Sequence, residues 1–366
     1  MSFKFVLLWT DAALWALFVA LIVYAVRIVR HEQLRATWTK VLRDPAALCS
    51  AMVLLLFLGV TALDSVHFRR ALAPTAGQAA AQVYFDTRAE SLLDLALSRQ
   101  IAMRETTYSG PLAYLAYTKQ PVERDGQITR ELPRLLHGGA HLKNPAQEWV
   151  GDVRGRVIGG VVLGLALAAL CSVAAAWLLR RAHGGTLQAW QDIAADRTHL
   201  PVRAVLVMLA VICVFGGVVA ALMGHYHVFG TDRTGNDVLV QTLKSVRTAF
   251  VIGSLSTLAT LPIAISLGIL AGYFRGWVDE VVQYLYTTLS SVPSVLLIAA
   301  CVLMVQVGLD KHPEWFETGV ERSDLKVFML CAILGLTGWA TLCRLVRAET
   351  LKLRELDFVQ AATAFG

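Results

Sequence analysis

The sequence predicts an all-α, polytopic membrane protein with about seven transmembrane helices and a small mixed segment outside the membrane between the second and third helices. Of its 366 residues, 56% are hydrophobic and only 16% are charged, whereas soluble proteins carry about 45–50% apolar and about 25% charged residues. The charge-poor residues gather in stretches of about 18–26 residues, the length that an α-helix needs to cross about 30 Å of hydrocarbon.

Seven such stretches follow one another along the chain. The predicted spans are Phe5–Val26, Ala46–Leu63, Val157–Leu179, Val202–Met223, Phe250–Tyr273, Val282–Val307 and Val327–Cys343. Asp11 lies near the start of the first span, where we expect its carboxylate to reach the headgroup layer; the alternative is a buried functional carboxylate.

Basic residues next to the spans predict the orientation of the chain. Arginines follow the first, third, fifth and seventh spans, at Arg27, Arg180, Arg275 and Arg344, and such residues favour the cytoplasmic side. The N-terminus is therefore predicted to lie outside the membrane and residue 366 on the cytoplasmic side. This placement also accounts for the net charge of +6, so no nucleic-acid partner is expected.

A polar stretch of about ninety residues, 64–156, separates the second and third spans, and we call it the outer segment. Apolar residues at helical spacing predict one amphipathic helix over Val83–Ile101. The run Glu123–Gly126 between two extended stretches predicts a turn or hairpin.

Small residues and prolines indicate how the spans pack. Gly160 and Gly164, and likewise Gly268 and Gly272, have the spacing that lets two helices approach closely. Prolines in the fifth and sixth spans, Pro262 and Pro293, each remove a helix hydrogen bond and favour a kink. These features suit a moving pathway and a static bundle equally well.

No catalytic, cofactor or metal site is predicted. The sequence has no GxxxxGK[ST], GxSxG or HExxH motif, so we expect no enzyme activity and no ATP-binding site in the chain. The six cysteines lie in or beside apolar spans and indicate no disulfide framework. Two histidine pairs, His137 with His141 and His225 with His227, leave metal binding open beside an ordinary turn.

Two stretches in the second half of the chain carry more specific information. The first, residues 229–238, reads Phe-Gly-Thr-Asp-Arg-Thr-Gly-Asn-Asp-Val and follows the fourth span. Its Asp232 and Asp237 could meet the amino end of a peptide. Alternatively, Asp232 could cap a helix while Asp237 is solvated. The second stretch, residues 344–366, predicts an amphipathic helix that leaves the membrane after the seventh span.

Together these stretches resemble the second permease subunit of bacterial ABC importers for dipeptides, oligopeptides and nickel. The family's periplasmic G-T-D-x-x-G-R-D-V motif is matched by Gly230, Thr231, Asp232, Gly235, Asp237 and Val238, with Asn236 in place of Arg. Its cytoplasmic EAA…G loop, which couples the permease to the ATPase, is matched by Gln360, Ala361, Ala362 and Gly366, with Gln360 in place of Glu. Residues 271–279 are similar to the family's short inner turn.

The resemblance implies a division of the chain and a set of partners. Residues 202–366 would form a partial permease core with four spans that ends in the cytoplasmic coupling loop. Residues 1–201 would be an N-terminal extension with three spans and the outer segment at 64–156. The coupling loop would comprise Glu355, Asp357, Phe358, Gln360, Ala361, Ala362 and Gly366.

The implied protein is a permease of the bacterial inner membrane that forms half of a path for di- or oligopeptides. Its partners would be a second permease, two ABC ATPase subunits that bind ATP and Mg, a periplasmic solute-binding protein and the lipid bilayer. The family continues beyond the position of Gly366, so a truncated or split subunit is expected. The alternatives are a membrane-bound sensor with a periplasmic ligand-binding segment and, third, a membrane enzyme.

Overall fold

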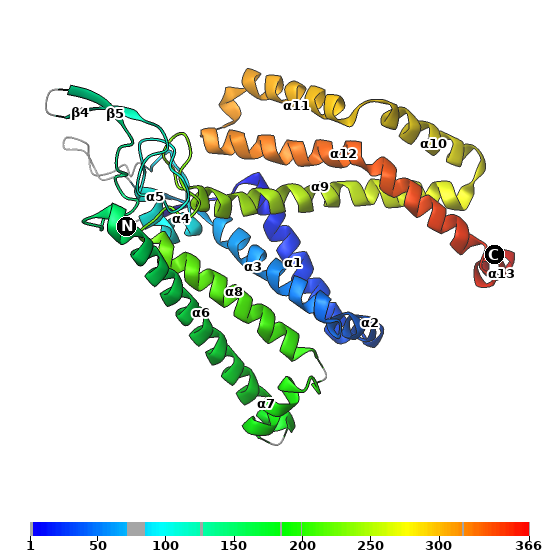
Figure 1. The fold of residues 1–366 in the computed structure, drawn as a ribbon. Helices are drawn as coiled ribbons and strands as arrows, with labels where there is room; N and C mark the ends of the chain where they lie inside the picture. Colours follow the sequence, from blue (N-terminus) through cyan, green and yellow to red (C-terminus); the bar gives the residue numbers. More distant parts are fainter. Residues whose placement is uncertain are drawn as a thin grey trace. The chain divides into compact units, whose positions relative to one another are not determined.

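Long helices make up most of the structure, a computed structural model that describes residues 3–71, 85–124, 127–183, 185–198, 200–316 and 318–365 (Figure 1). Within these residues, seven helices are long and apolar enough to cross a membrane. They are α1 (Trp9–Arg30), α3 (Pro45–Asp64), α6 (Pro145–His183), α8 (Val202–Met223), α9 (Val238–Phe274), α11 (Ser294–Lys311) and α12 (Gly319–Arg354). The predicted number of about seven membrane-spanning helices and the all-α membrane fold are thereby confirmed.

The chain divides into two compact units, which are described separately. The first unit comprises residues 1–20, 65–90 and 248–366, and the second comprises residues 21–64 and 91–247. Helices α1 and α9 each contribute to both units. The predicted division at residue 201 stays a prediction.

In the second unit, α6 and α8 pack against each other through glycines. A Cβ added at Gly160 would lie 2.6 Å from Val218 Cα, and one at Gly164 would lie 2.5 Å from Val214 Cα. Real Cβ atoms do not tolerate such distances, so only glycine permits this approach of the two backbones. The predicted close contact at this glycine pair is confirmed. This unit also contains the helices α2 (Glu32–Leu42) and α7 (Thr186–Ala194).

The outer segment folds differently from the single helix predicted for Val83–Ile101. Two short helices, α4 (Leu92–Ala96) and α5 (Ser98–Ala102), take the place of its second half, and a two-residue strand, β3 (Glu90–Ser91), precedes them. Ser91 begins α4 with a capping box in which Ser91 and Asp94 exchange side-chain and backbone hydrogen bonds. Val83 and Tyr84 lie outside the described residues.

The predicted hairpin of the outer segment is confirmed. Strands β4 (Gln120–Arg124) and β5 (Gln127–Glu131) pair antiparallel, with Gln120 opposite Glu131 and Arg124 opposite Gln127. Two residues of the predicted turn, Asp125 and Gly126, lie outside the described residues.

In the first unit, α9 and α12 approach each other through the second glycine pair. A Cβ added at Gly268 would lie 2.8 Å from Val346 Cβ, and one at Gly272 would lie 2.6 Å from Thr350 Cβ. Farther along the same two helices, a Cβ at Gly335 would meet Ala259 Cβ at 2.3 Å. The prediction of close packing at Gly268 and Gly272 is confirmed.

The sixth predicted span, Val282–Val307, is not one helix. The structure has α10 (Gly276–Ser291) and α11, separated at Pro293, because the residue before a proline is disfavoured in the helical region. Val292 accordingly has an extended backbone, with φ −89° and ψ 132°. Pro262, by contrast, lies inside α9 without ending it. Both α10 and α11 run along α12 (Figure 1).

The N-terminal residues of the first unit are tied to α12 by buried polar contacts. Strand β1 (Phe3–Val6) pairs antiparallel with β2 (His67–Arg70). The expectation for Asp11 is wrong: its side chain is fully buried, and Oδ2 accepts a 2.8 Å hydrogen bond from His67 Nδ1. Asp324 of α12 accepts a 3.0 Å hydrogen bond from the backbone N–H of Thr10 and another from its hydroxyl.

Two short elements complete the first unit. They are the 3-10 turn η1 (Pro313–Trp315) and the helix α13 (Asp357–Phe365).

Candidate functional site

The periplasmic-type motif at residues 230–238 forms a loop between α8 and α9 that is held by a buried histidine. His227 Nδ1 donates a 2.7 Å hydrogen bond to Asp237 Oδ2, and both side chains are buried. The other oxygen of Asp237 accepts from the backbone N–H groups of Leu239 (2.7 Å) and Val240 (3.4 Å). Asp237 is thus the N-terminal cap of α9.

The other ring nitrogen of His227 points toward Glu105 of the outer segment. His227 Nε2 lies 3.4 Å from Glu105 Oε1, an ion-pair contact rather than a hydrogen bond. The Glu105 carboxylate also accepts hydrogen bonds from the backbone N–H groups of Leu136 (2.8 Å), His137 (2.7 Å) and Gly138 (3.0 Å). A buried imidazole therefore bridges two carboxylates from distant parts of the sequence.

The charges of this cluster shift the pKa values of its members. Burial lowers the pKa of His227, but the hydrogen bond to Asp237 and the neighbouring Glu105 outweigh it and raise the pKa to about 9. Burial raises the pKa of Glu105, but His227 and the three backbone donors outweigh it and lower the pKa to about 2. At neutral pH the His227 ring is therefore protonated and the Glu105 carboxyl is ionised.

The two motif glycines allow the backbone of the outer segment to approach this loop. Gly230 and Gly235 have φ values of +78° and +79°. A Cβ at Gly235 would lie 1.7 Å from the carbonyl oxygen of Glu105, and one at Gly230 would lie 2.3 Å from that of Ser109. The Thr231 hydroxyl donates a 2.8 Å hydrogen bond to the carbonyl of Thr107. The motif loop therefore packs directly against the backbone of the outer segment, and we call this contact the loop–segment contact.

The roles expected for the two motif aspartates are exchanged in the structure. Asp237, expected to be solvated, is buried and caps α9. Asp232, expected to cap a helix, is half-buried and closes its own loop. Its Oδ1 accepts from the backbone N–H groups of Thr234 and Asn236, and its Oδ2 accepts from Gln241 Nε2. Partial burial raises the pKa of Asp232, but these hydrogen bonds outweigh it and lower the pKa.

A second polar cluster in this unit brings together one histidine from each sequence pair. Asp152 Oδ2 accepts hydrogen bonds from Arg156 Nε (2.8 Å) and the Tyr226 hydroxyl (2.7 Å) and lies 2.9 Å from His141 Nε2. The rings of His141 and His225 are 5.0 Å apart. Within the described residues, no group of three or more His, Cys, Asp and Glu side chains is arranged to hold a metal ion.

The predicted coupling loop forms a separate helix in the first unit. Helix α12 ends at Arg354, and Glu355 follows as its cap and forms an ion pair with Arg275 Nη2 at 2.5 Å. Helix α13 begins at Asp357 and includes Phe358, Gln360, Ala361 and Ala362, whereas Gly366 lies outside the described residues.

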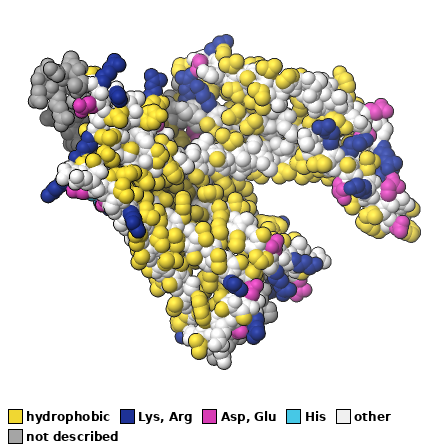
Figure 2. All heavy atoms as spheres, viewed as in Figure 1, with side chains coloured by type: hydrophobic (Ala, Val, Ile, Leu, Met, Phe, Trp, Pro, Cys, Tyr) yellow, Lys and Arg dark blue, Asp and Glu magenta, His cyan; other side chains and the backbone are white. Residues whose placement is uncertain are grey.

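No residue of α13 is buried. Phe358 is 69% exposed and Phe365 is 92% exposed, and charged side chains gather where α12 passes into α13 (Figure 2). A short amphipathic helix with exposed aromatic residues is a surface suited to a protein partner.

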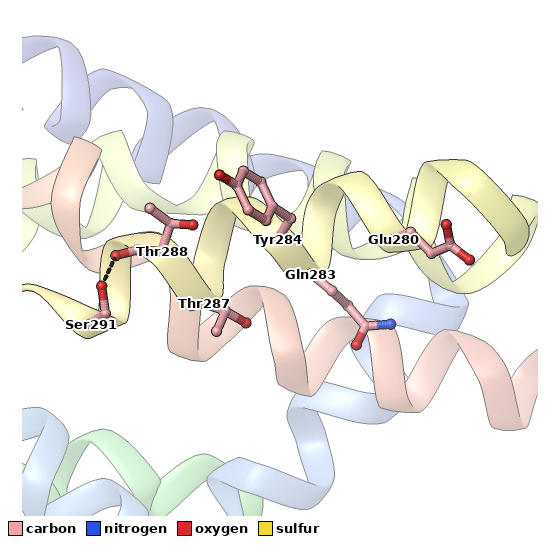
Figure 3. A pocket seen from close by; sticks show the side chains of 6 residues that line it. All are labelled: Glu280, Gln283, Tyr284, Thr287, Thr288 and Ser291. Atoms are coloured by element: carbon pink, nitrogen blue, oxygen red, sulfur yellow. Dashed lines mark hydrogen bonds between the residues drawn. The ribbon is translucent and has the colours of Figure 1, made fainter.

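Helix α10 presents three distinct faces. Val282, Tyr286 and Leu289 pack in a cluster with α9 and α12. Trp277, Val281 and Leu285 form an exposed apolar face. A third set of side chains is polar and lines a groove along the helix (Figure 3): Glu280, Gln283, Tyr284, Thr287, Thr288 and Ser291. Such a row of hydroxyl and amide groups is costly against lipid, so it indicates a face that meets water or a polar ligand.

The orientation of α10 is fixed by a bidentate ion pair with α12. Arg347 donates to both carboxylate oxygens of Asp279, from Nε to Oδ1 and from Nη2 to Oδ2 at 2.5 Å. Bidentate pairing fixes direction as well as distance. It therefore fixes the rotation of α10 about its own axis relative to α12, and with it the direction that the polar row faces.

Sequence reasoning missed Glu105 and the polar row of α10, and it considered His227 only for metal binding or a turn. The spacing of residues 280, 284, 287, 288 and 291 is helical and could have indicated one polar face. For Glu105 no local signal exists, since its partners lie 31 to 33 residues away or farther along the chain.

Comparison with known proteins places the C-terminal part of the chain. Residues 264–366 match the family model described as "Binding-protein-dependent transport system inner membrane component". The chain is 31% identical over 143 residues to the oligopeptide transport system permease protein OppC of Mycobacterium tuberculosis, covering 39% of this chain and 44% of the relative. It is 29% identical to the glutathione transport system permease protein GsiD of Pectobacterium atrosepticum (38% of this chain, 40% of the relative).

A third relative, the dipeptide transport system permease protein DppC of Lactococcus lactis, is 27% identical over 140 residues, with 38% of this chain and 36% of the relative covered. The chain thus spans less than half the length of each of these relatives. Seven apolar helices and the matched domain indicate a multi-pass protein of the inner membrane. Residues 264–366 are therefore similar to the inner membrane components of binding-protein-dependent transport systems.

Proposed function

We propose that the chain is a permease subunit of an ATP-driven ABC importer and forms half of a translocation path for di- or oligopeptides. The observation that carries this proposal is α13. It follows the last long helix of the matched domain, contains the EAA-like residues Gln360–Ala362 and buries none of its side chains. The printed names of the relatives, oligopeptide, dipeptide and glutathione permeases, support a peptide-type substrate.

Energy would enter from separate ATPase subunits. The sequence contains no GxxxxGK[ST] loop, so ATP and Mg would be bound by two ABC ATPase partners rather than by this chain. A second permease would complete the path, and a periplasmic solute-binding protein would deliver the substrate. The N-terminus would be periplasmic and α13 cytoplasmic, as the positions of the arginines favour.

The polar row of α10 is our candidate for the surface that lines the translocation path. Thr287, Thr288 and Ser291 offer hydroxyl groups that can donate to and accept from peptide groups, and Glu280 offers a carboxylate for an ammonium group. Alternating access would then be a rigid-body movement of packed helices. The close α9–α12 contact at Gly268 and Gly272 would let these two helices move as one piece.

Co-purification of the ATPase tests the role of α13. We expect Phe358→Ala to weaken retention of the ATPase by about tenfold, because an exposed aromatic side chain would lose its buried area in the complex. Trp315→Ala removes a side chain of similar exposure, 64%, in the turn before α12 and serves as the matched control. Equal retention by both variants would contradict the docking role.

Peptide uptake tests the role of α10. The double change Thr287→Val and Thr288→Val removes two hydroxyl groups from the polar row at nearly constant volume and should lower uptake. Leu285→Val, on the exposed apolar face of the same helix, should leave uptake unchanged. If the two variants transport alike, the polar row does not line the path. Nothing in the comparisons or in the described residues favours a membrane-bound sensor.

A further inference from the structure

A second polar pocket lies in the first unit, where the turn between α9 and α10 meets the end of α12 and α13. Its volume is about 580 Å³, and its lining includes Tyr273, Arg275, Arg354, Glu355, Gln360 and Thr363. Helix α13 thus forms one wall of this pocket with Gln360 and Thr363.

The pocket carries a positive charge that its own residues do not balance. Arg275 is paired with Glu355, whereas the Nη1 atom of Arg354 is buried and has no hydrogen-bond partner among the described residues. A buried donor without an acceptor costs free energy, and an anionic oxygen is the group that best satisfies a guanidinium.

The backbone at Arg275 is strained in a way that favours a ligand site. Its φ is +54° and its ψ is −164°, a region that residues other than glycine rarely adopt. Such strain clusters where a side chain is held ready for a ligand. Here it presents the Arg275 side chain, which is 48% exposed, at the rim of the pocket.

The surroundings of the pocket have the composition of a membrane–water interface. Tyr273, Phe274 and Trp277 are 41%, 62% and 75% exposed and follow one another around the α9–α10 turn, as aromatic side chains do at the headgroup level. Basic pockets between transmembrane helices on the cytoplasmic side bind acidic headgroups, because that leaflet is rich in anionic lipid.

We propose that this pocket binds the phosphate headgroup of an anionic phospholipid, with Arg354 and Arg275 as its cationic partners. The bound phosphate contacts both the end of α12 and α13, so it holds α13 in a fixed direction relative to α12. The lipid then acts as a structural ligand of the helix that we assign to ATPase docking, although its binding does not depend on that assignment.

Native mass spectrometry of the purified full chain tests the proposal. The chain is titrated with phosphatidylglycerol and, separately, with phosphatidylcholine of the same acyl chains. We expect the anionic lipid to bind in preference, and Arg354→Gln and Arg275→Gln each to weaken its binding by about fivefold, the effect of one lost cation near a charged leaflet.

The matched control is Lys352→Gln, which removes one positive charge two residues from Arg354. Lys352 is 74% exposed, pairs with Glu349 and does not line the pocket, so its loss should leave lipid binding unchanged. Arg354→Lys keeps the charge and should retain most of the affinity. Thr363→Asp places a negative charge on the opposite wall and should abolish the preference without touching either arginine.

Two outcomes would overturn the proposal. Equal losses for Lys352→Gln and Arg354→Gln would mean that the chain attracts anionic lipid only through its overall charge. Displacement of the lipid by an equal concentration of inorganic phosphate would mean that the pocket takes a free anion. Because neither readout involves transport or the ATPase, both leave the proposed import function standing.

Discussion

His227 Nδ1 donates to Asp237 Oδ2 at 2.7 Å, while the other oxygen of the same carboxylate caps the first turn of α9. This relationship joins the end of α8 to the start of α9 through one buried side chain. Glu105 on the other side of the ring brings the outer segment into the same cluster. The buried carboxylate of Asp237 is therefore engaged in holding the loop together, which argues against a role in contacting a peptide.

The first prediction is that the loop–segment contact becomes less stable at alkaline pH. The pKa of His227 is raised from 6.5 to about 9 in the fold, so its stabilisation is complete below pH 6.5 and disappears as the pH rises through 9. The pKa of Glu105 is lowered from 4.5 to about 2, so its stabilisation is complete above pH 4.5 and is lost as the pH falls through 2. The loop–segment contact should be most stable between pH 4.5 and 6.5.

Hydrogen exchange measures this prediction. The amides of Leu136, His137 and Gly138 donate to Glu105, and their protection, corrected for the intrinsic exchange rate, should fall between pH 6.5 and 9. The total loss should be about 3 kcal/mol, since one pKa unit corresponds to about 1.4 kcal/mol. The variant His227→Gln should lack this slope, and an unchanged slope in that variant would assign the effect to another group.

The second prediction concerns Gly235. Gly235→Ala should release the outer segment from the motif, because φ is +79° and the new Cβ would lie 1.7 Å from the carbonyl oxygen of Glu105. Strain of this kind costs about 1–3 kcal/mol before any displacement of backbone. Limited proteolysis of the outer segment should become faster. Gly224→Ala is the control, since nothing lies within 4 Å of a Cβ at Gly224, and equal cleavage rates in both variants would refute the close contact.

The third prediction separates two glycines of α9. Gly268→Val should destabilise the protein by about 1–3 kcal/mol through overpacking, because Val346 Cβ and the Cys343 carbonyl lie 2.8 Å and 2.9 Å from the new Cβ. Gly253→Val introduces the same side chain in the same helix where nothing lies within 4 Å. Thermal unfolding in detergent should show a lower Tm for the first variant alone. Matching Tm values would contradict the α9–α12 packing.

The spans and their packing could be predicted because their signals are local. A helix that crosses a membrane needs about 20 consecutive apolar residues, and the spacing of Gly268 and Gly272 already marks a close contact on one helix face. The break of the sixth span is a matter of context. Pro293 and Pro262 carry the same local signal, yet α9 continues through Pro262 while α10 ends before Pro293.

The buried polar clusters could not be predicted because their members are far apart in sequence. Glu105 meets His227 across more than a hundred residues, and Asp324 meets Thr10 across 314. Asp11 illustrates the consequence. An acidic residue near the start of a span is compatible with the headgroup layer, and only its distant partner His67 shows that the carboxylate is buried instead.

The fourth prediction is that Asp11 and His67 are energetically coupled, which would make the N-terminal residues part of the same folding unit as α12. Strand β2 carries both His67 and Arg69, and Arg69 Nη2 donates a 2.8 Å hydrogen bond to Glu321 Oε1 of α12. A double-mutant cycle of Asp11→Asn and His67→Gln should give a coupling of about 1 kcal/mol or more in thermal or chemical unfolding, because both side chains are largely buried.

An exposed ion pair of the same unit provides the control for this cycle. Lys352 Nζ lies 3.0 Å from Glu349 Oε2 with side chains 74% and 61% exposed, so a cycle of Lys352→Gln and Glu349→Gln should give only about 0–0.5 kcal/mol. Couplings of equal size at the two pairs would mean that the buried contact does not hold β2 to α1. A larger coupling at Asp11 and His67 means that the first twenty residues contribute to the stability of the first unit, so that their removal would destabilise it.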